Sequence, residues 1–227
     1  MDTLHEDQDV IAVNKPAGIA VIPGRDEKPD QALRGQLESL RGERLWVVHR
    51  LDRDTSGVVL FARNEQAHRR LSMAFEGREV SKTYLAWTRG VPQPAEGVIT
   101  VPLHPARKGK MRPAHEGEAG GLASETAYRV LASREAIAEV EVSPRTGRQH
   151  QIRVHMRAIG APLLVDPFYG KCESIESGVL GAGSPALPRL TLHAWKLAYG
   201  ELRVIAPLPG DLAALQAWLR DINKASA

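Results

Sequence analysis

The sequence contains almost no cysteine, few aromatic residues and no long apolar segment. Cys172 is the only cysteine among 227 residues, which excludes an internal disulfide and a cysteine-based zinc cluster. No run of 18 or more apolar residues occurs, so the sequence predicts no membrane-spanning helix. The first residues, 1–7, are acidic and polar, which is the opposite of a signal peptide. We therefore expect a cytoplasmic protein with no membrane partner.

Sequence motifs that hold nucleotide cofactors or metal ions are also missing. There is no P-loop, no Gly-x-Gly-x-x-Gly segment and no His-Glu-x-x-His pattern. The net charge of +3 is only mildly basic and does not by itself predict a nucleic-acid partner. The distribution of the charges along the chain is therefore more informative than their sum.

Apolar periodicity and turn residues predict an α+β protein with a mixed, largely antiparallel sheet and flanking helices. A long loop or hairpin is expected at 104–123 and a surface loop at 171–188. No repeat or linker splits the sequence, so we expect a single domain over 1–227. Strands are expected at 9–14, 46–48, 58–62, 80–87, 125–131, 136–143, 190–199 and 201–205, and helices at 31–40, 65–75, 148–159 and 211–223.

A charged turn at 49–57 lies between two apolar strand-like runs. It places one carboxylate, Asp52, between Arg50 and Arg53. Two strands can hold a reactive group in a fixed direction, and the two arginines suit an anionic partner. An aspartate in a turn can equally satisfy backbone N–H groups, and the spacing alone leaves both interpretations open.

Two further polar clusters suit RNA. The basic segment 145–155 includes Arg148 and His150 at the start of a predicted helix, where phosphate binds readily, although a solvated basic face is also common. Arg153 lies between apolar neighbours, and a buried guanidinium requires a carboxylate such as Asp52. Lys82 and Tyr84 share one face of a predicted strand and could meet a phosphate and a base, although tyrosine is frequent in strands for structural reasons.

The segment His49-Arg50-Leu51-Asp52, followed by Thr55-Ser56-Gly57, resembles the signature of the RluA-type pseudouridine synthases. The resemblance covers most of the chain. It implies the pseudouridine synthase fold with a central active-site cleft, and isomerisation of uridine in RNA to pseudouridine after base flipping, with no cofactor and no metal. Segments that are similar to further motifs of this family follow in the same order at 14–18, 82–84, 147–155, 166–170 and 192–194.

The resemblance also implies roles for individual residues. Asp52 would be the essential catalytic residue and Arg153 its ionic partner. Tyr84 would stack on the target base and assist the final removal of a proton. Arg50 would occupy the space left by the extruded nucleotide, and Ile152 would contact the uracil ring. Lys82, Arg148 and His150 would complete the substrate-binding residues.

The sequence departs from the family pattern at two positions. Gln149 stands where the family usually has Thr, and Val165 stands where Gly usually precedes Asp166. Because the first motif lies at 14–18, we expect no counterpart of the small RNA-binding domain that is often fused ahead of the catalytic unit, and we expect the catalytic domain itself to capture RNA. The candidates for an RNA-clamping loop are Arg107, Lys108, Lys110 and Arg112, although a basic hairpin that serves only solubility is the alternative.

We expect a monomer that acts on large-subunit ribosomal RNA, on tRNA or on both, without a protein partner. One alternative is an inactive RNA-binding protein of the same fold, which would not need a carboxylate among phosphates. Another is a metal-dependent hydrolase built on His49, Asp52 and Asp54, with His150 or His155. The last two histidines are five residues apart and do not share a helical face, which argues against that site.

Overall fold

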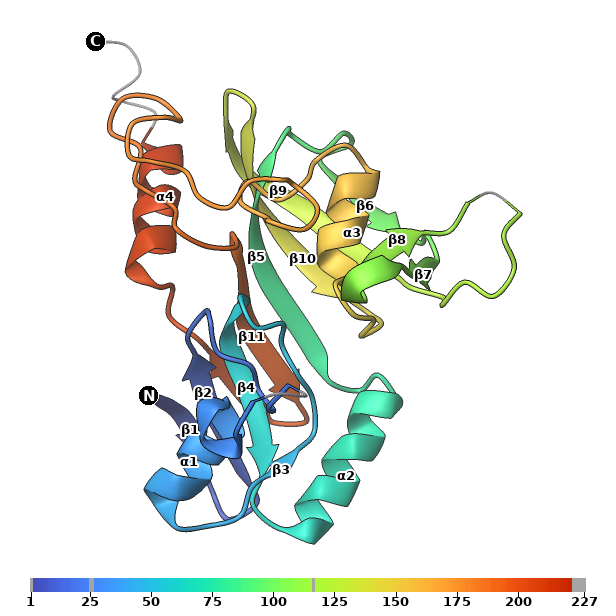
Figure 1. The fold of residues 1–227 in the computed structure, drawn as a ribbon, viewed down its shortest axis with the longest axis vertical. Helices are drawn as coiled ribbons and strands as arrows, with labels where there is room; N and C mark the ends of the chain where they lie inside the picture. Colours follow the sequence, from blue (N-terminus) through green and yellow to red (C-terminus); the bar gives the residue numbers. More distant parts are fainter. Residues whose placement is uncertain (1, 25–26, 116, 222–227) are drawn as a thin grey trace. The chain divides into compact units, whose positions relative to one another are not determined.

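The computed structural model describes residues 2–24, 27–115 and 117–221, and the chain divides into two compact units (Figure 1). The first unit comprises Met1–Lys82 and His193–Pro207, and the second comprises Thr83–Leu192 and Leu208–Ala227. Among the described residues, every helix is too short or too polar to pass through a lipid bilayer.

The first unit is a mixed sheet with two helices. The strands follow the order β1-β2-β4-β11, β3 pairs with β4, and β12 pairs with β11. All these pairings are antiparallel except β4 with β11, where Ser56 lies opposite His193 and Gly57 opposite Ala194. The bounds are β1 Thr3–Glu6, β2 Val10–Lys15, β3 Trp46–Val47, β4 Ser56–Ala62, β11 Leu192–Tyr199, β12 Leu202–Ile205, α1 Leu33–Arg41 and α2 Glu65–Glu76, with a short 3-10 helix at Pro29–Gln31.

Strand β4 is the centre of the first unit because every residue in it is buried. Helix α2 packs its apolar face, which includes Leu71 and Ala74, into the same core as Val58 and Leu60. Asn64 caps this helix by accepting a hydrogen bond from the N–H of Ala67 at 2.8 Å. The loop that carries Asp52 therefore leads directly into a strand that is buried along its whole length.

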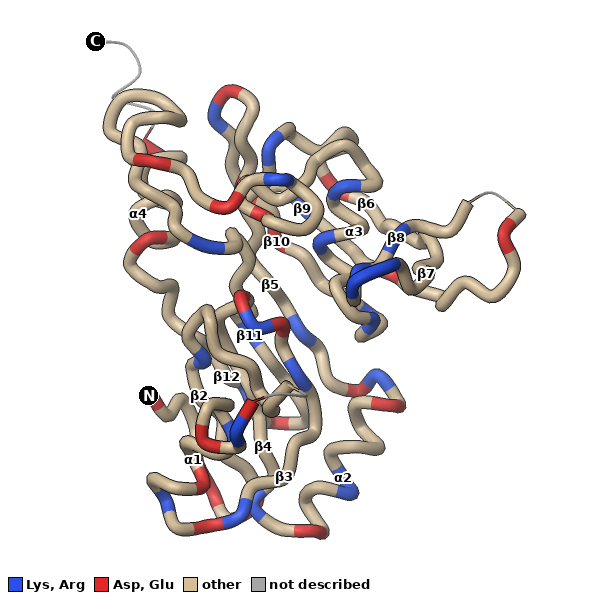
Figure 2. The backbone as a smooth tube through the Cα atoms, viewed as in Figure 1, with Lys and Arg blue, Asp and Glu red and all other residues tan. Residues whose placement is uncertain are grey.

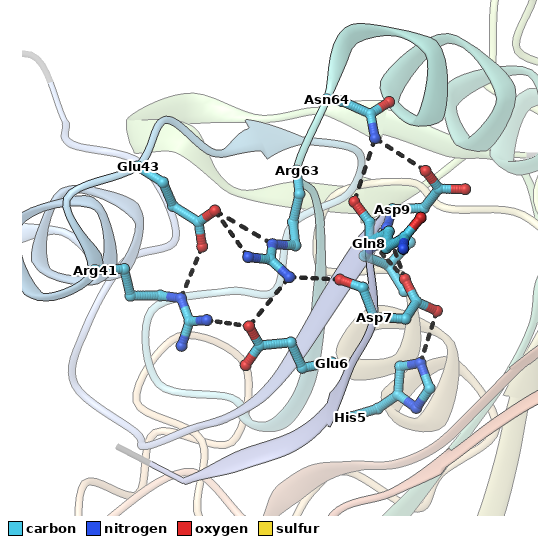
Figure 3. Close-up of polar contacts among 10 residues, drawn as sticks. His5, Glu6, Asp7, Gln8, Asp9, Arg41, Glu43, Arg63 and Asn64 are labelled. Atoms are coloured by element: carbon cyan, nitrogen blue, oxygen red, sulfur yellow. Dashed lines mark hydrogen bonds and ion pairs between the residues drawn. The ribbon is translucent and has the colours of Figure 1, made fainter.

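A network of ion pairs fastens the β1–β2 turn to the rest of the first unit (Figure 3). Arg41 binds Glu6 and Glu43, and Arg63 bridges the same two carboxylates. Hydrogen bonds from Arg41 and Arg63 lower the pKa of Glu43. Since the two guanidinium groups share both carboxylates, the network stabilises the turn more than an isolated surface pair would.

The second unit is an antiparallel sheet in the order β5-β10-β9-β6, with a separate β7–β8 hairpin and two helices. Helix α3 lies against β8 (Figure 1), and its Ile152 and Met156 join Val140 and Val142 of β10 in the core. The bounds are β5 Ser81–Arg89, β6 Glu96–Ile99, β7 Leu103–Pro105, β8 Met111–Pro113, β9 Thr126–Arg134, β10 Ile137–Pro144, α3 Gln151–Ala158 and α4 Gly210–Arg220, with a 3-10 turn at Arg107–Gly109.

The structure confirms the expected α+β class and each expected strand and helix, with differences at the ends. The basic helix begins at Gln151 and not at 148, because His150 has a left-handed backbone with a φ of 53° that interrupts helical geometry. The last helix ends at Arg220, and residues 222–223 lie outside the described part of the chain. Strands β1 and β6 were not predicted. The 171–188 segment is irregular as expected, but it buries Ile175 and Leu187.

Gly57 should be intolerant of any side chain. Its φ is 117°, and a Cβ atom there would lie 2.1 Å from the carbonyl oxygen of Ala194 in β11. We expect Gly57→Ala to lower the free energy of unfolding by about 3 kcal/mol or more. Gly42→Ala is the matched control, since Gly42 has a φ of 66° but no atom within 4 Å of the Cβ position, and it should cost about 1 kcal/mol. Urea unfolding followed by circular dichroism measures both; equal losses would contradict the close approach as the cause.

Candidate active site

A buried lysine, Lys15, binds the backbone of the loop that carries Asp52. The side chain of Lys15 is fully buried, and its Nζ donates to the carbonyl oxygens of Pro16, Ile19 and Arg53 at 2.8, 2.8 and 2.7 Å. The N–H of Gly18 also donates to the Arg53 carbonyl, at 3.0 Å. Segment 14–18 therefore fixes the backbone immediately after Asp52, a role that the sequence analysis did not assign to Lys15.

A buried serine and histidine fix the end of the same loop. The Ser56 hydroxyl oxygen lies 2.8 Å from Nδ1 of His193, and Nε2 of His193 lies 3.3 Å from the carbonyl oxygen of Ala206. A carbonyl can only accept, so Nε2 carries a hydrogen, and in the neutral ring Nδ1 then accepts from the serine hydroxyl. This contact joins the start of β4 to β11, and it gives a structural reason for the motif segments 55–57 and 192–194.

His49 is a structural histidine at the start of the loop. Its Nε2 accepts a hydrogen bond from the N–H of Leu60 at 2.9 Å, and its ring stacks on Phe75 with centroids 4.7 Å apart. Burial, with a smaller contribution from the charge of Lys82, lowers the pKa of His49 to about 3. The neutral ring therefore carries its hydrogen on Nδ1. Nε2 thus binds the backbone of β4, whereas the metal-dependent hydrolase considered above would use His49 as a metal ligand.

The cations that were predicted to bind substrate differ in their surroundings. Arg50 is exposed, and Asp52 is half-buried. Arg53 forms an ion pair with Glu27, whose pKa is lowered by the N–H of Gly24 and by Arg53. Arg50 therefore fits contact with RNA better than Arg53 does.

Lys82 is half-buried beside an aromatic ring. Its ammonium lies 6.0 Å from the ring centroid of Phe75, and burial lowers the pKa of Lys82. The position over the Phe75 ring is a favourable one for a cation. The contact of Lys82 with substrate remains a prediction.

In the second unit, Arg153 has a buried carboxylate partner. Its Nε donates to one oxygen of the Asp166 carboxylate and a terminal nitrogen donates to the other, both at 2.8 Å. The exposed fraction is 5% for the side chain of Arg153 and 0% for that of Asp166. The prediction that a buried guanidinium here requires a carboxylate is confirmed, with Asp166 as a partner. The predicted pairing with Asp52 remains a prediction, because Asp52 belongs to the other unit.

Tyr84 and Ile152 belong to one hydrophobic cluster of the second unit. Tyr84 lies on β5 opposite Val142 of β10, and its partly buried ring packs against the cluster that contains Val142 and Ile152. Ile152 precedes Arg153 on α3 and is 7% exposed. The structure therefore brings together Tyr84 and Ile152, two of the residues that were expected to contact the target base.

The loop before α3 makes contacts to neighbouring segments. Arg148 is exposed and donates to the carbonyl of Ala123 at 3.2 Å. His150 Nδ1 lies 2.8 Å from the hydroxyl oxygen of Tyr169. Gln149 donates to the carbonyl of Gly109 at 3.1 Å, so this departure from the family pattern links the loop to the β7–β8 hairpin.

Two other positions are accounted for by packing. Val165, the second departure, is fully buried. His155 is also fully buried, with Nδ1 2.9 Å from the Thr126 hydroxyl and Nε2 2.9 Å from the Val101 carbonyl. Burial lowers the pKa of His155, so it is a core residue and not an exposed metal ligand.

Lysine and arginine gather between β7 and β8, as Figure 2 shows. Arg107 and Lys108 are exposed at this turn. Arg112 instead makes a two-pronged contact with Glu118, and a hydrogen bond from Arg112 contributes most to the lowered pKa of that glutamate, which falls to about 2. Segment 107–112 contains no acidic residue, but Glu118, six residues after Arg112, supplies a carboxylate for it.

Comparison with known proteins identifies the family of this chain. The sequence model for RNA pseudouridylate synthase matches residues 9–158. The dual-specificity RNA pseudouridine synthase RluA of Escherichia coli is 38% identical over 209 residues, which cover 87% of this chain and 88% of that protein. An uncharacterized RNA pseudouridine synthase of Zymomonas mobilis is 40% identical over 193 residues, covering 82% of this chain and 87% of the relative.

Solved structures show the same fold. Human RNA pseudouridylate synthase domain containing 4 superposes with a TM-score of 0.77 at 29% identity, and the match covers 96% of this chain and 92% of the human one. Human RNA pseudouridylate synthase domain containing 1 gives a TM-score of 0.74 at 27% identity, with 94% and 86% covered. The match to the family and the extent of the RluA similarity together mean that this chain belongs to the RNA pseudouridine synthase family.

Proposed function

We propose that this enzyme converts uridine in large-subunit ribosomal RNA, in tRNA or in both into pseudouridine, with Asp52 as the essential catalytic residue. The observation that supports an RNA of this kind is the 38% identity to the dual-specificity RluA proteins over 87% of the chain. We also propose that the two units act as one catalytic domain, in a cytoplasmic monomer that needs no protein partner.

The reaction leaves the composition of the RNA unchanged. The bond between ribose C1′ and uracil N1 breaks, the uracil turns, and a bond forms between C1′ and C5. The proton on C5 leaves, and N1 takes up a proton. No electron acceptor is required, because the reaction is an internal rearrangement.

The target base must leave the RNA stack before a side chain can reach it, at a cost of a few kcal/mol. Stacking on Tyr84 would return about 1–3 kcal/mol of that cost. Arg50, which is exposed beside Asp52, suits the space vacated by the base. Whichever step the carboxylate of Asp52 takes, a guanidinium such as Arg153 beside it favours the ionised form that the step needs.

Replacing Asp52 should abolish turnover without abolishing RNA binding. We expect Asp52→Ala and Asp52→Asn to release no detectable tritium from RNA that carries tritium on uridine C5, while their Kd for that RNA stays within about threefold of wild type. Asp54→Asn, two residues away in the same loop, is the matched control and should remain active. Substantial tritium release by Asp52→Ala would defeat the catalytic assignment.

The hydroxyl of Tyr84 should matter for turnover more than for binding. We expect Tyr84→Phe to bind RNA with unchanged Kd, because the stacking ring is retained, and to lower kcat at least about tenfold through the loss of proton transfer. Tyr84→Leu should weaken binding as well, because it removes the ring. Single-turnover tritium release together with RNA-binding titrations measures both effects. A Tyr84→Phe enzyme with wild-type kcat would remove any role for the hydroxyl.

The β7–β8 turn should contribute to the salt dependence of RNA affinity. Each phosphate contact with single-stranded RNA adds about 0.7 to the slope of log Kd against log salt concentration. We expect Arg107→Ala with Lys108→Ala to reduce the slope by about 1.4, for two contacts. Arg112→Ala is the control with a smaller effect, since Arg112 is engaged by Glu118. Fluorescence anisotropy at several salt concentrations measures the slope, and an unchanged slope in the double variant would show that the turn makes no contact.

A further inference from the structure

We propose that Phe168 is a stacking site for a nucleobase of the RNA substrate other than the target uracil, with Lys110 placed to meet a phosphate of the same strand. The inference rests on the proposed function, because it requires RNA as the ligand. It adds a binding residue on segment 166–170, whose motif had no role in the predicted site.

Phe168 is exposed and has cationic and aromatic neighbours. The exposed fraction of this residue is 44%. The guanidinium carbon of Arg153 and the ammonium of Lys110 each lie 5.1 Å from its ring centroid. The ring of His150 meets it edge-on at 5.7 Å. A single exposed phenylalanine is ordinary, but one set among these groups is suited to a ligand that is both flat and anionic.

The backbone below the ring is fixed. One oxygen of the buried Asp166 carboxylate accepts the N–H groups of Phe168 and Tyr169, at 2.9 and 3.1 Å, and the N–H of Gly170 donates to the Asp166 carbonyl at 2.9 Å. The same carboxylate holds Arg153. The exposed ring is therefore presented by a segment whose conformation is already set, so binding through it orders few additional groups.

Tyr169 connects this segment to the basic turn. Its hydroxyl accepts the N–H of Met111 in β8 at 2.8 Å and lies 2.8 Å from Nδ1 of His150. Lys110, the residue before Met111, donates to the Phe168 carbonyl at 3.3 Å. The exposed aromatic ring and the cations of the β7–β8 turn consequently belong to one surface of the second unit.

RNA fits this surface better than a protein or lipid ligand does. Proteins that bind single-stranded nucleic acid combine aromatic rings, on which bases stack, with cations that follow the phosphates. The ammonium of Lys110 is carried on a flexible side chain, so it can move from the ring toward a phosphate when a base occupies the ring. Stacking tolerates any base, and Phe168 should therefore supply affinity and position, lowering KM, and leave kcat unchanged.

The test compares four variants in binding to a fluorescein-labelled stem–loop RNA with a uridine-rich loop. We expect Phe168→Ala and Phe168→Leu to raise Kd about tenfold, within the range expected for loss of one stacked base. Phe168→Trp should bind as tightly as wild type or more tightly. Val179→Ala is the matched control, since Val179 is 67% exposed in the same unit, and it should have no effect. KM should rise with Kd in the Ala and Leu variants while kcat holds.

Abasic sites in the RNA loop then identify the stacked base. Removing the base that stacks on Phe168 should weaken wild-type binding about tenfold and leave Phe168→Ala binding unchanged, because the contact is already lost. The slope of log Kd against log salt should stay at the wild-type value in Phe168→Leu, since no cation is removed.

The proposal is overturned if Phe168→Leu binds like wild type, or if its loss of affinity comes with a reduced salt slope. A wild-type enzyme that neither binds RNA nor forms pseudouridine would overturn the proposed function and this inference together. Wild-type binding with no effect of the Phe168 variants would overturn this inference alone.

Discussion

The buried pair of Arg153 and Asp166 is the contact on which the geometry of the second unit depends. Burying two charges is costly unless every hydrogen-bonding group finds a partner. Asp166 meets this condition with two bonds to Arg153 and with the N–H groups of Phe168 and Tyr169. One carboxylate thus fixes helix α3, and with it Ile152, to the segment that presents an exposed aromatic ring.

Lys15 has the corresponding position in the first unit. Its ammonium donates hydrogen bonds to three carbonyl oxygens. One carbonyl belongs to Arg53, so the charge is buried against the loop that carries Asp52. A second contact, Ser56 with His193, fixes the other end of this loop. Buried residues therefore hold this loop at both ends, which is what a precisely placed carboxylate requires.

Local patterns predicted what depends on neighbours in sequence. The helix at 65–75 and the strand at 80–87 were predicted close to α2 and β5, because caps such as Asn64 and Gly77 and apolar periodicity act over a few residues. Contacts between distant segments could not be predicted from the sequence. The apolar neighbours of Arg153 indicated that it needs a carboxylate but did not identify Asp166 as that partner. The residues around His49 likewise gave no sign that its ring stacks on Phe75. Strand β1 was missed because its Thr-Leu-His-Glu sequence is polar, and it is ordered by pairing with β2.

Burial separates two groups among the residues discussed above, apart from half-buried ones such as Asp52, Lys82 and Tyr84. The first group is buried, and its polar groups bind other parts of the chain: Lys15, Ser56, Arg153, Asp166 and His193. Arg50, Arg107, Lys108, Arg148 and Phe168 are exposed. A motif match is therefore partly a statement about folding, since several of its residues hold loops in place. We expect the choice between RNA substrates to depend most on the exposed groups, because a ligand can reach them without any rearrangement of the chain. In the second unit, most of these groups lie on the β7–β8 turn and on the segments before and after α3, so substrate selection can change there without disturbing the buried contacts that shape the site.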